Sequence, residues 1–145
     1  MTTIFKFNKE LTDQAAQDPK YKAFLEWLDT NGALYPKVIY PAIYTHGDSK
    51  LVGVMCKEQI QPAETIMYIP NKCLVSTESA RRSEIGEIYR NYEDIFVANV
   101  DRDHMTLVLY LMYERSKGTD SFYHPYFEVC ELVESPALWP QEMID

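Results

Sequence analysis

Residues 50–70 read KLVGVMCKEQIQPAETIMYIP, and this stretch decides the fold that the sequence predicts. Two runs rich in Val, Ile and Met flank a polar connector with Pro62 and Ala63, which is the pattern of two short strands joined by a turn. Gly53 lies inside the first run. A glycine within a strand marks either a bulge or a place where a ligand or another backbone comes close. These residues alone leave both alternatives open.

The composition indicates one globular domain with an acidic surface. The chain has 145 residues, of which 46% are hydrophobic and 25% charged, and its net charge is −8. This length suits one core and is too short for two ordinary ones. Nucleic-acid binding is not expected, because phosphate contacts need clustered Lys and Arg, and the longest basic cluster is Arg81-Arg82. An acidic surface suits a basic protein partner, although it more often serves solubility.

The cysteines and the hydropathy predict an intracellular, soluble protein, either cytoplasmic or nuclear. Cys56, Cys73 and Cys130 are odd in number and far apart, so we expect neither a disulfide framework nor a zinc site. His46 and His124 have no carboxylate or Cys at ligand spacing, so we assign no metal. No apolar run approaches the roughly 18 residues that a membrane-spanning helix needs, so we expect no membrane partner.

The start of the chain predicts an arm followed by a helix. Residues 1–17 show no sustained period, and we interpret them as an N-terminal arm that docks through its aromatic side chains. Asp18-Pro19 predicts a helix start, and Gly32 predicts the end of the same helix. One face of this helix carries an apolar row at helical spacing, made of Tyr21, Phe24, Leu25 and Leu28.

The segments on either side of the quoted stretch are expected to be extended and short. Residues 34–44 contain Pro36 and Pro41, which favours an edge strand or an extended segment over a central strand. Residues 46–49 predict a turn, because they combine His, Gly, Asp and Ser. Residues 73–75 predict a further short strand.

The region after residue 75 is predicted to be helical. Ser76 is a suitable cap for a helix, and residues 81–100 predict short helices with uncertain ends. Residues 121–127 form a dense aromatic segment beside a proline. Within it, Tyr123 and Tyr126 either belong to the core, which is the commoner place for aromatic side chains, or border a substrate channel.

Residues 104–117 predict the longest helix, which starts after Asp103 and ends at Gly118. Its centre is apolar on every side, so we expect it to run through the core. Glu114, near its end, either pairs with a neighbouring cation or faces a buried donor. The predicted fold is therefore α+β: short strands from residues 38–75 pack with a long buried helix, and a helical insertion begins at about residue 77.

Four landmarks occur in a characteristic order over most of the chain. They are a helix with a W…GA ending (residues 24–33), a glycine-containing strand, turn and strand ending in Ile-Pro (53–70), an apolar helix ending in L-x-x-E (107–114), and a segment like S-x-W-x-P-Y followed by P-x-x-W (121–126 and 136–139). In this order the chain resembles the N-terminal half of SET-domain protein methyltransferases. The subgroup is the one that includes the Rubisco large-subunit lysine methyltransferase and the actin-histidine methyltransferase.

The resemblance implies S-adenosylmethionine as cofactor. In that family a Gly-x-Gly backbone approaches the amino acid end of the ligand, and the matching positions here are Lys50, Leu51, Val52 and Gly53. Only the second glycine is present. The family's Asn-His segment belongs to a later half, and this chain has no Asn-His dipeptide. We therefore expect residues 18–145 to form the N-terminal part of a SET-like domain, with the C-terminal half absent and no catalytic residue assigned.

Two functions follow from this resemblance. The first is S-adenosylmethionine-dependent methyl transfer to a Lys or His side chain of a protein, with this chain as an N-terminal portion that is inactive by itself. The alternative is a non-catalytic, SET-like structural or interaction subunit of a larger assembly. A protein is the expected partner in both cases, either as substrate or as the surface that covers the exposed half-domain.

Overall fold

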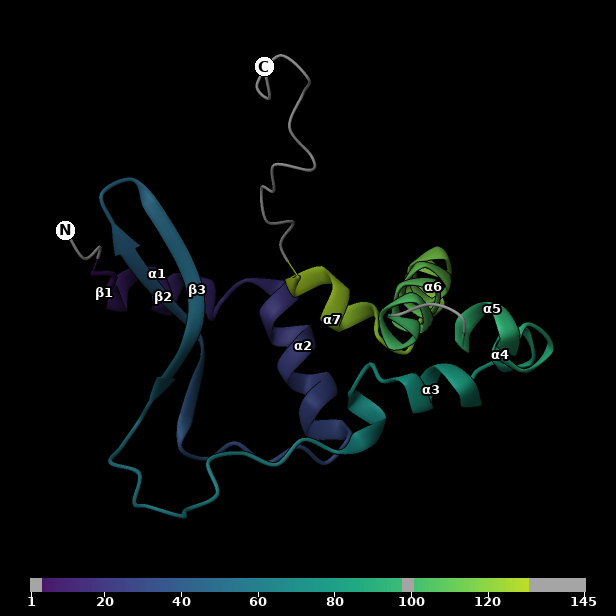
Figure 1. The fold of residues 1–145 in the computed structure, drawn as a ribbon. Helices are drawn as coiled ribbons and strands as arrows, with labels where there is room; N and C mark the ends of the chain where they lie inside the picture. The colour runs from purple at the N-terminus through teal and green to yellow at the C-terminus, as the bar shows by residue number, and fades with distance from the viewer. Residues whose placement is uncertain (1–3, 98–100, 131–145) are drawn as a thin grey trace.

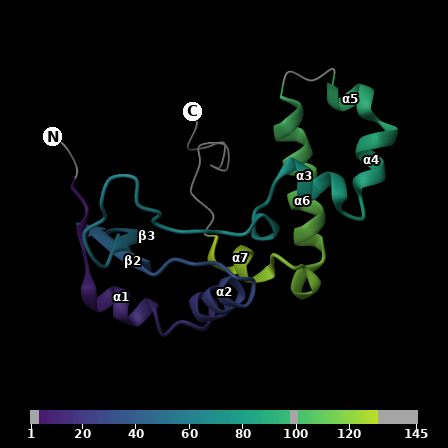
Figure 2. The same ribbon diagram turned by 90° about the horizontal axis from the view of Figure 1, so that it is seen from below.

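The strands lie at one end of the molecule and most of the short helices at the other, with α2 and α7 between them (Figure 1, Figure 2). The computed structural model describes residues 4–97 and 101–130. Its elements, with two 3₁₀ turns labelled η, are β1 (Lys6–Phe7), α1 (Lys9–Ala15), α2 (Pro19–Thr30), β2 (Val38–His46), β3 (Ser49–Cys56), η1 (Asn71–Cys73), α3 (Thr77–Arg82), α4 (Gly86–Asn91), α5 (Glu93–Val97), α6 (Arg102–Ser116), η2 (Gly118–Asp120) and α7 (His124–Val129). The predicted α+β class is confirmed. The predicted landmark at residues 136–139 lies outside the described residues.

The three strands form one antiparallel sheet in the order β1-β2-β3. Gly47 and Asp48 alone join β2 to β3, since His46 pairs with Ser49. Gly47 has a φ of +55°, which favours glycine, and a glycine at the first position of a two-residue loop is typical of tight hairpins. The predicted turn at residues 46–49 is confirmed.

The pairing of β3 corrects two predictions. The prediction that the two apolar runs of residues 50–70 form two strands joined by a turn is wrong: β3 pairs with β2, and Tyr68 instead forms an isolated bridge with Leu34. A two-residue loop closes at a lower entropic cost than the long connector. The preference for an edge strand around Pro41 is also wrong, because β2 is central. The register shifts between Ile39 and Ala42, so the residue without an N–H falls in a gap of the ladder.

The segment interpreted as an arm contains β1 and α1, and α1 covers one face of the sheet. Asn8 caps α1, since its side chain accepts a hydrogen bond from the N–H of Leu11 at 3.0 Å. Thr12 is buried, and its Oγ1 accepts a hydrogen bond from the N–H of Ile43 at 2.9 Å. Ile43 is fully buried. A polar residue therefore joins α1 to the sheet, and hydrophobic periodicity does not detect such a contact.

The helix predicted after Asp18 is confirmed as α2. The Asp18 side chain accepts a hydrogen bond from the N–H of Lys20 at 3.0 Å, and Pro19 occupies the first turn. Tyr21 and Leu28 are buried, and Gly32 follows the helix with a φ of +88°. α2 packs against α7, so this helix connects the sheet end of the molecule to the helical end.

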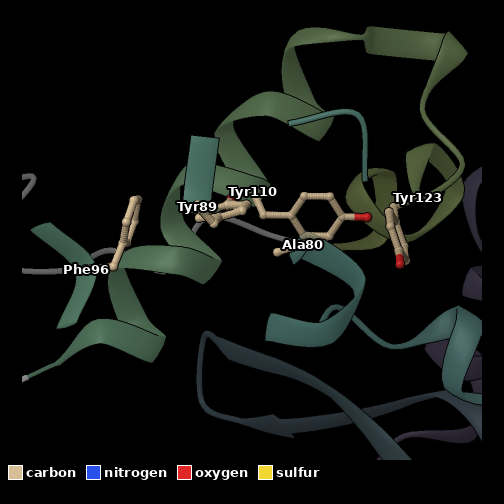
Figure 3. Close-up of a cluster of buried hydrophobic side chains, with 5 residues drawn as sticks. All are labelled: Ala80, Tyr89, Phe96, Tyr110 and Tyr123. Carbon is tan, nitrogen blue, oxygen red and sulfur yellow. The ribbon is translucent and has the colours of Figure 1, made fainter. Parts of the chain in front are cut away.

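The helical end is built around aromatic side chains (Figure 3). Its buried members are Ala80, Tyr89, Phe96, Tyr110 and Tyr123. Tyr110 lies between Tyr89 and Tyr123 in Figure 3, and the Tyr89 hydroxyl donates to the carbonyl of Thr106 at 3.2 Å. Burial and a hydrogen bond with Tyr123 raise the pKa of Tyr110. These rings fix the short helices α3 to α5 on α6.

Two details of the helical end differ from the predictions. Residues 73–75 are not a strand, because residues 71–73 form the η1 turn and α3 then starts at its predicted cap, Ser76. α6 does not run through the core: Val108 and Met112 are 41% and 65% exposed. Thr106, Tyr110 and Glu114, four residues apart, form its buried face. α3 and α5 pack against α6, and the described residues leave its opposite side uncovered.

The ion pair between Lys37 and Glu64 makes the fold sensitive to acid. The Lys37 ammonium and the N–H of Gln61, which donates at 2.9 Å, lower the pKa of Glu64. The stability from a lowered pKa is present above the ordinary carboxyl value of about 4.3 and is lost as the pH falls through the lowered value. We expect wild type to exceed Glu64→Gln in Tm at about pH 6 and to approach it at about pH 3. Thermal melts of both proteins across this range measure the gap, and a constant gap would contradict the expectation.

Candidate functional site

The residues matched to the cofactor segment lie on β3, and their side chains alternate between the two faces of the sheet. Leu51 pairs with Tyr44, and Gly53 lies on the same face two residues further along. Lys50 and Val52 face the other way, and Lys50 lines a hollow of about 240 Å³ beside α1. The four residues therefore share a strand edge rather than one side-chain surface.

Gly53 makes room for the ring of Tyr44. A Cβ atom at position 53 would lie 3.3 Å from Cε2 of Tyr44, which is tighter than ordinary van der Waals contact. The Tyr44 hydroxyl donates to the carbonyl of Val54 at 2.9 Å. Val54 lies opposite the register shift at Pro41, which has no N–H to donate. In this structure the glycine allows a close approach by a side chain, and the bulge itself belongs to β2.

Gly53→Ala is expected to lower the free energy of unfolding by about 1 kcal/mol, because the added methyl group presses on the Tyr44 ring. In a Tyr44→Ala background the same change is expected to raise the free energy of unfolding by about 0.5 kcal/mol, since alanine loses less chain entropy than glycine. Urea denaturation of the four proteins measures the coupling. Additive effects in the double variant would contradict the packing role of Gly53.

The outer edge of β3 is open to a ligand that binds main-chain groups. Within residues 4–97 and 101–130, β3 pairs with β2 and with no second strand, so its other edge presents N–H and C=O groups without a strand partner. Leu51 is 51% exposed on the face that carries Tyr44. The edge fits the amino acid end of S-adenosylmethionine, which main-chain groups can hold. The space above Gly53 does not fit it, because Tyr44 fills that space.

Tyr123 lies in a buried environment. Its side chain is 4% exposed, and its hydroxyl lies 3.3 Å from the carbonyl oxygens of both Lys72 and Leu74. Its N–H donates to Oγ of Ser121 at 3.1 Å. It also borders a hollow of about 860 Å³ beside η1 and α3, which residues 50–53 do not line. The structure therefore does not bring Tyr123 together with the cofactor segment.

Tyr126 lies in a third hollow, which we call the apolar groove. The groove has a volume of about 340 Å³ between α2, the sheet and α7, and its lining includes Leu25, Tyr40, Val54, Met67, Ile69 and Tyr126. Val54 directly follows Gly53, so Tyr126 shares a hollow with β3 and Tyr123 does not. A hydrogen bond with the Cys130 side chain and burial raise the pKa of Tyr126. A channel role for either tyrosine stays a prediction.

Sequence reasoning missed Tyr44 and left the partner of Glu114 open. Tyr44 was assigned to an extended segment, and the signal that could have marked it is an aromatic residue within reach of a strand glycine across a short turn. Glu114 is buried and accepts hydrogen bonds from Oγ of Ser121 at 2.6 Å and from Nζ of Lys117 at 2.8 Å. Both alternatives for Glu114, a neighbouring cation and a buried donor, are therefore realised together.

The described residues offer neither a metal-ligand cluster nor a helix suited to a membrane. Residues 4–97 and 101–130 contain no group of three or more His, Cys, Asp or Glu side chains that could hold a metal ion. No helix in this part of the chain is long and apolar enough to cross a membrane. The cysteines Cys56, Cys73 and Cys130 are free.

The chain is similar in sequence to two actin-histidine N-methyltransferases. It is 26% identical over 112 residues to the protein of Gallus gallus and 25% identical over 118 residues to that of Rhinolophus ferrumequinum. These alignments cover 77% and 81% of this chain but 17% and 18% of the relatives, so the chain spans less than a fifth of their length. No family model matches the chain.

The fold is similar to that of Rubisco LSMT, which was solved bound to sinefungin and monomethyllysine. The TM-score is 0.61 at 21% sequence identity, over 86% of this chain and 27% of that chain. Sequence and structure comparisons thus point to the same group of proteins. They confirm the resemblance expected from the ordered landmarks and show a common fold over most of the chain.

Proposed function

We propose that this chain is part of an S-adenosylmethionine-dependent methyltransferase that modifies a Lys or His side chain of a protein. The observation that carries the proposal is the fold shared with Rubisco LSMT over 86% of the chain. That protein was solved with monomethyllysine and with sinefungin, an analogue of S-adenosylmethionine. The similarity to actin-histidine N-methyltransferases adds His as an acceptor class.

The task of this chain in such an enzyme is to position the reactants. Bound S-adenosylmethionine supplies an electrophilic methyl group on a sulfonium sulfur. The outer edge of β3 at residues 50–53, which no strand of the described residues pairs with, offers N–H and C=O groups to the amino acid end of the cofactor. Tyr126, in the apolar groove that it shares with Val54, borders the path of the acceptor side chain. The acceptor nitrogen must meet the methyl carbon in line with the carbon–sulfur bond. The residues that line the groove therefore have to hold the acceptor side chain in one orientation.

Leu51→Gly is expected to tighten sinefungin binding several-fold, because it removes a side chain at the position where the family keeps a glycine. Leu34→Gly is the matched control, since Leu34 is 63% exposed and lies outside β3, and it is expected to leave the affinity unchanged. Isothermal titration calorimetry of the full-length gene product, as wild type and with each substitution, measures the affinity. Mass spectrometry of actin and Rubisco large subunit after incubation with the full-length protein and S-adenosylmethionine tests methyl transfer. The absence of both binding and transfer by the full-length protein would refute the proposal.

A second candidate function is a non-catalytic, SET-like interaction module. Leu51 and Val54 favour it, because both are apolar and about half exposed on β3, whose outer edge has no strand partner among the described residues and is a template for another chain. Analytical ultracentrifugation and thermal melting separate the two functions when combined with the calorimetry. A compact monomer that melts cooperatively would contradict the need for an assembly partner.

The proposal includes the domain boundaries and the location expected from the sequence. Residues 1–17 form the arm, residues 18–145 form the N-terminal part of a SET-like domain with a helical insertion from about residue 77, and the protein is cytoplasmic or nuclear. The hydrogen bond between Thr12 and Ile43 connects the arm to the sheet. Limited proteolysis tests the boundary, and protection of residues 8–17 equal to that of β2 would contradict a separate arm.

A further inference from the structure

The hollow beside η1 and α3, which we call the polar hollow, has an excess of positive charge in an acidic protein. Its volume is about 860 Å³, and its charged lining residues are Lys72, Glu78 and Arg82. Two cations against one carboxylate leave a local balance of +1, whereas the whole chain carries −8. A concave site with an excess of one sign of charge attracts a ligand of the opposite sign. The polar hollow is therefore suited to an anionic group.

The cation available to such a ligand is Lys72. Arg82 already pairs with Glu78 one turn earlier on α3. Within residues 4–97 and 101–130, the Lys72 ammonium has no carboxylate partner, and the side chains of Asn71 and Thr77 make no hydrogen bond. An ammonium, an amide and a hydroxyl are donors to a carboxylate and to the main-chain carbonyls beside it. One carboxylate balances the excess charge, whereas a phosphate group, at about −2, does not.

The walls of the polar hollow are held in place by hydrogen bonds. The Tyr123 hydroxyl lies 3.3 Å from the carbonyl oxygens of Lys72 and Leu74, which fixes the main chain of η1 and of the residue after it. At the start of α3, Oγ of Ser76 accepts a hydrogen bond from the N–H of Ser79 at 3.1 Å. A site whose walls are already ordered loses less conformational entropy when a ligand binds. The hollow is thus formed before its ligand arrives.

Leu74 connects the polar hollow to the apolar groove. It lines both of them and is 45% exposed. The proposed function places the acceptor side chain in the apolar groove, and a substrate segment that leaves the groove past Leu74 enters the polar hollow. Phe122, which lines the polar hollow and is 44% exposed, offers this segment an apolar surface. The two hollows therefore suit one continuous stretch of a protein substrate.

We propose that the polar hollow binds an Asp or Glu side chain of the protein substrate, a few residues from the Lys or His that accepts the methyl group. The Lys72 ammonium pairs with the carboxylate, and the side chains of Asn71 and Thr77 bind the main chain next to it. The inference rests on the proposed function and adds the class of substrate to it, which is an acceptor residue with an acidic neighbour.

A pair of short peptides tests the charge preference. Both peptides are fluorescent, rich in glycine and carry one Lys, and a few residues away one of them has Glu where the other has Gln. Fluorescence anisotropy with the full-length gene product measures binding without cofactor or methyl transfer. We expect the Glu peptide to bind several-fold more tightly, although the negative charge of the chain as a whole favours the Gln peptide. Equal or tighter binding of the Gln peptide would overturn the inference.

Two charge reversals in the full-length protein locate the site. Lys72→Glu changes the hollow, and Lys6→Glu makes the same change at an exposed position of β1 outside it. We expect Lys72→Glu to abolish the preference for the Glu peptide and Lys6→Glu to retain it. The Lys72 side chain is exposed and Tyr123 contacts only its main-chain carbonyl, so the variant is expected to fold, which a thermal melt checks. Equal effects of the two reversals would contradict the assignment.

Carbodiimide coupling gives a second measurement on the wild-type protein. The reagent joins a bound carboxylate to a nearby amine, and we expect mass spectrometry to find the Glu peptide on Lys72 several-fold more often than on Lys6. Equal coupling at both lysines would overturn the inference. A preference that depends on Lys72, without sinefungin binding, would refute the proposed function and leave the acidic-peptide site standing. Sinefungin binding without that preference would refute only the acidic-peptide site.

Discussion

Replacing Tyr123 by Ala is expected to lower the free energy of unfolding by about 3–5 kcal/mol, the usual cost of removing a large buried ring. Tyr123 is 4% exposed and contacts the rings of Tyr110 on α6, Trp27 on α2 and Phe127 on α7. The cavity would therefore open where three helices meet. Urea denaturation followed by circular dichroism measures the change.

Tyr123→Phe distinguishes the contribution of the hydroxyl to stability from that of the ring. It is expected to cost about 1 kcal/mol, because the hydrogen bonds to the carbonyls of Lys72 and Leu74 are lost while the ring stays in place. If Tyr123→Ala lowered the free energy of unfolding no more than Tyr123→Phe does, the result would contradict a core role for the ring. In an active methyltransferase, Tyr123→Phe that stops methyl transfer without a large stability loss would show that the hydroxyl also acts in the substrate channel.

Glu114→Ala is expected to lower the free energy of unfolding by about 2–3 kcal/mol, since hydrogen bonds to charged groups contribute more than neutral ones. Glu114 is buried and connects α6 to the segment before α7 through Ser121 and Lys117. Ser121 is also buried, so its hydroxyl would lose its acceptor, whereas Lys117 keeps Glu84 at 3.7 Å. Chemical denaturation at neutral pH measures the loss.

Two control variants isolate the buried hydrogen bonds of Glu114. Glu114→Gln keeps an acceptor oxygen for Ser121 and is expected to lose about 1 kcal/mol. Glu128→Ala removes an exposed carboxylate on α7 and is expected to change the free energy by less than about 0.5 kcal/mol. Equal losses for Glu114→Ala and Glu128→Ala would show that burial of Glu114 contributes nothing.

Helix starts and ends were predictable because both partners of each cap lie close together in the sequence. The Asp18 side chain accepts from the N–H of Lys20, and Oγ of Ser76 accepts from the N–H of Ser79 at 3.1 Å. Gly118, with a φ of +58°, marks the end of the long helix. Each contact spans two or three residues, so local residue types suffice to predict it.

Strand pairing could not be predicted in the same way. Residues 38–46, 49–56 and 64–70 are all apolar runs, and any two of them satisfy the pattern of a hairpin. The two-residue loop at Gly47 and the gap in the ladder at Pro41 select β2 as the partner of β3. The gap in the ladder depends on the three-dimensional register of β2 and β3. The prolines alone therefore predicted an edge strand, whereas β2 is central.

The candidate site was also predictable only in part. The sequence placed residues 50–53 on a strand, and the ordered landmarks linked that strand to a cofactor. Only the structure shows that Tyr44 fills the space above Gly53 and that the open approach lies along the outer edge of β3. Tyr44 and Gly53 meet because of the β2–β3 register, which the residue pattern left undecided.

The sequence by itself determined the helix caps at Asp18 and Ser76, the turn at residues 46–49, the acidic balance and the likeness to SET-domain methyltransferases. The tertiary structure decided the partner of β3, the single buried face of α6 and the grouping of Tyr126 with β3 around the apolar groove. Caps and turns are formed by groups a few residues apart, so their energies are local. Strand partners and buried faces depend on which distant surfaces cover one another, and several arrangements of the same apolar runs compete for that burial.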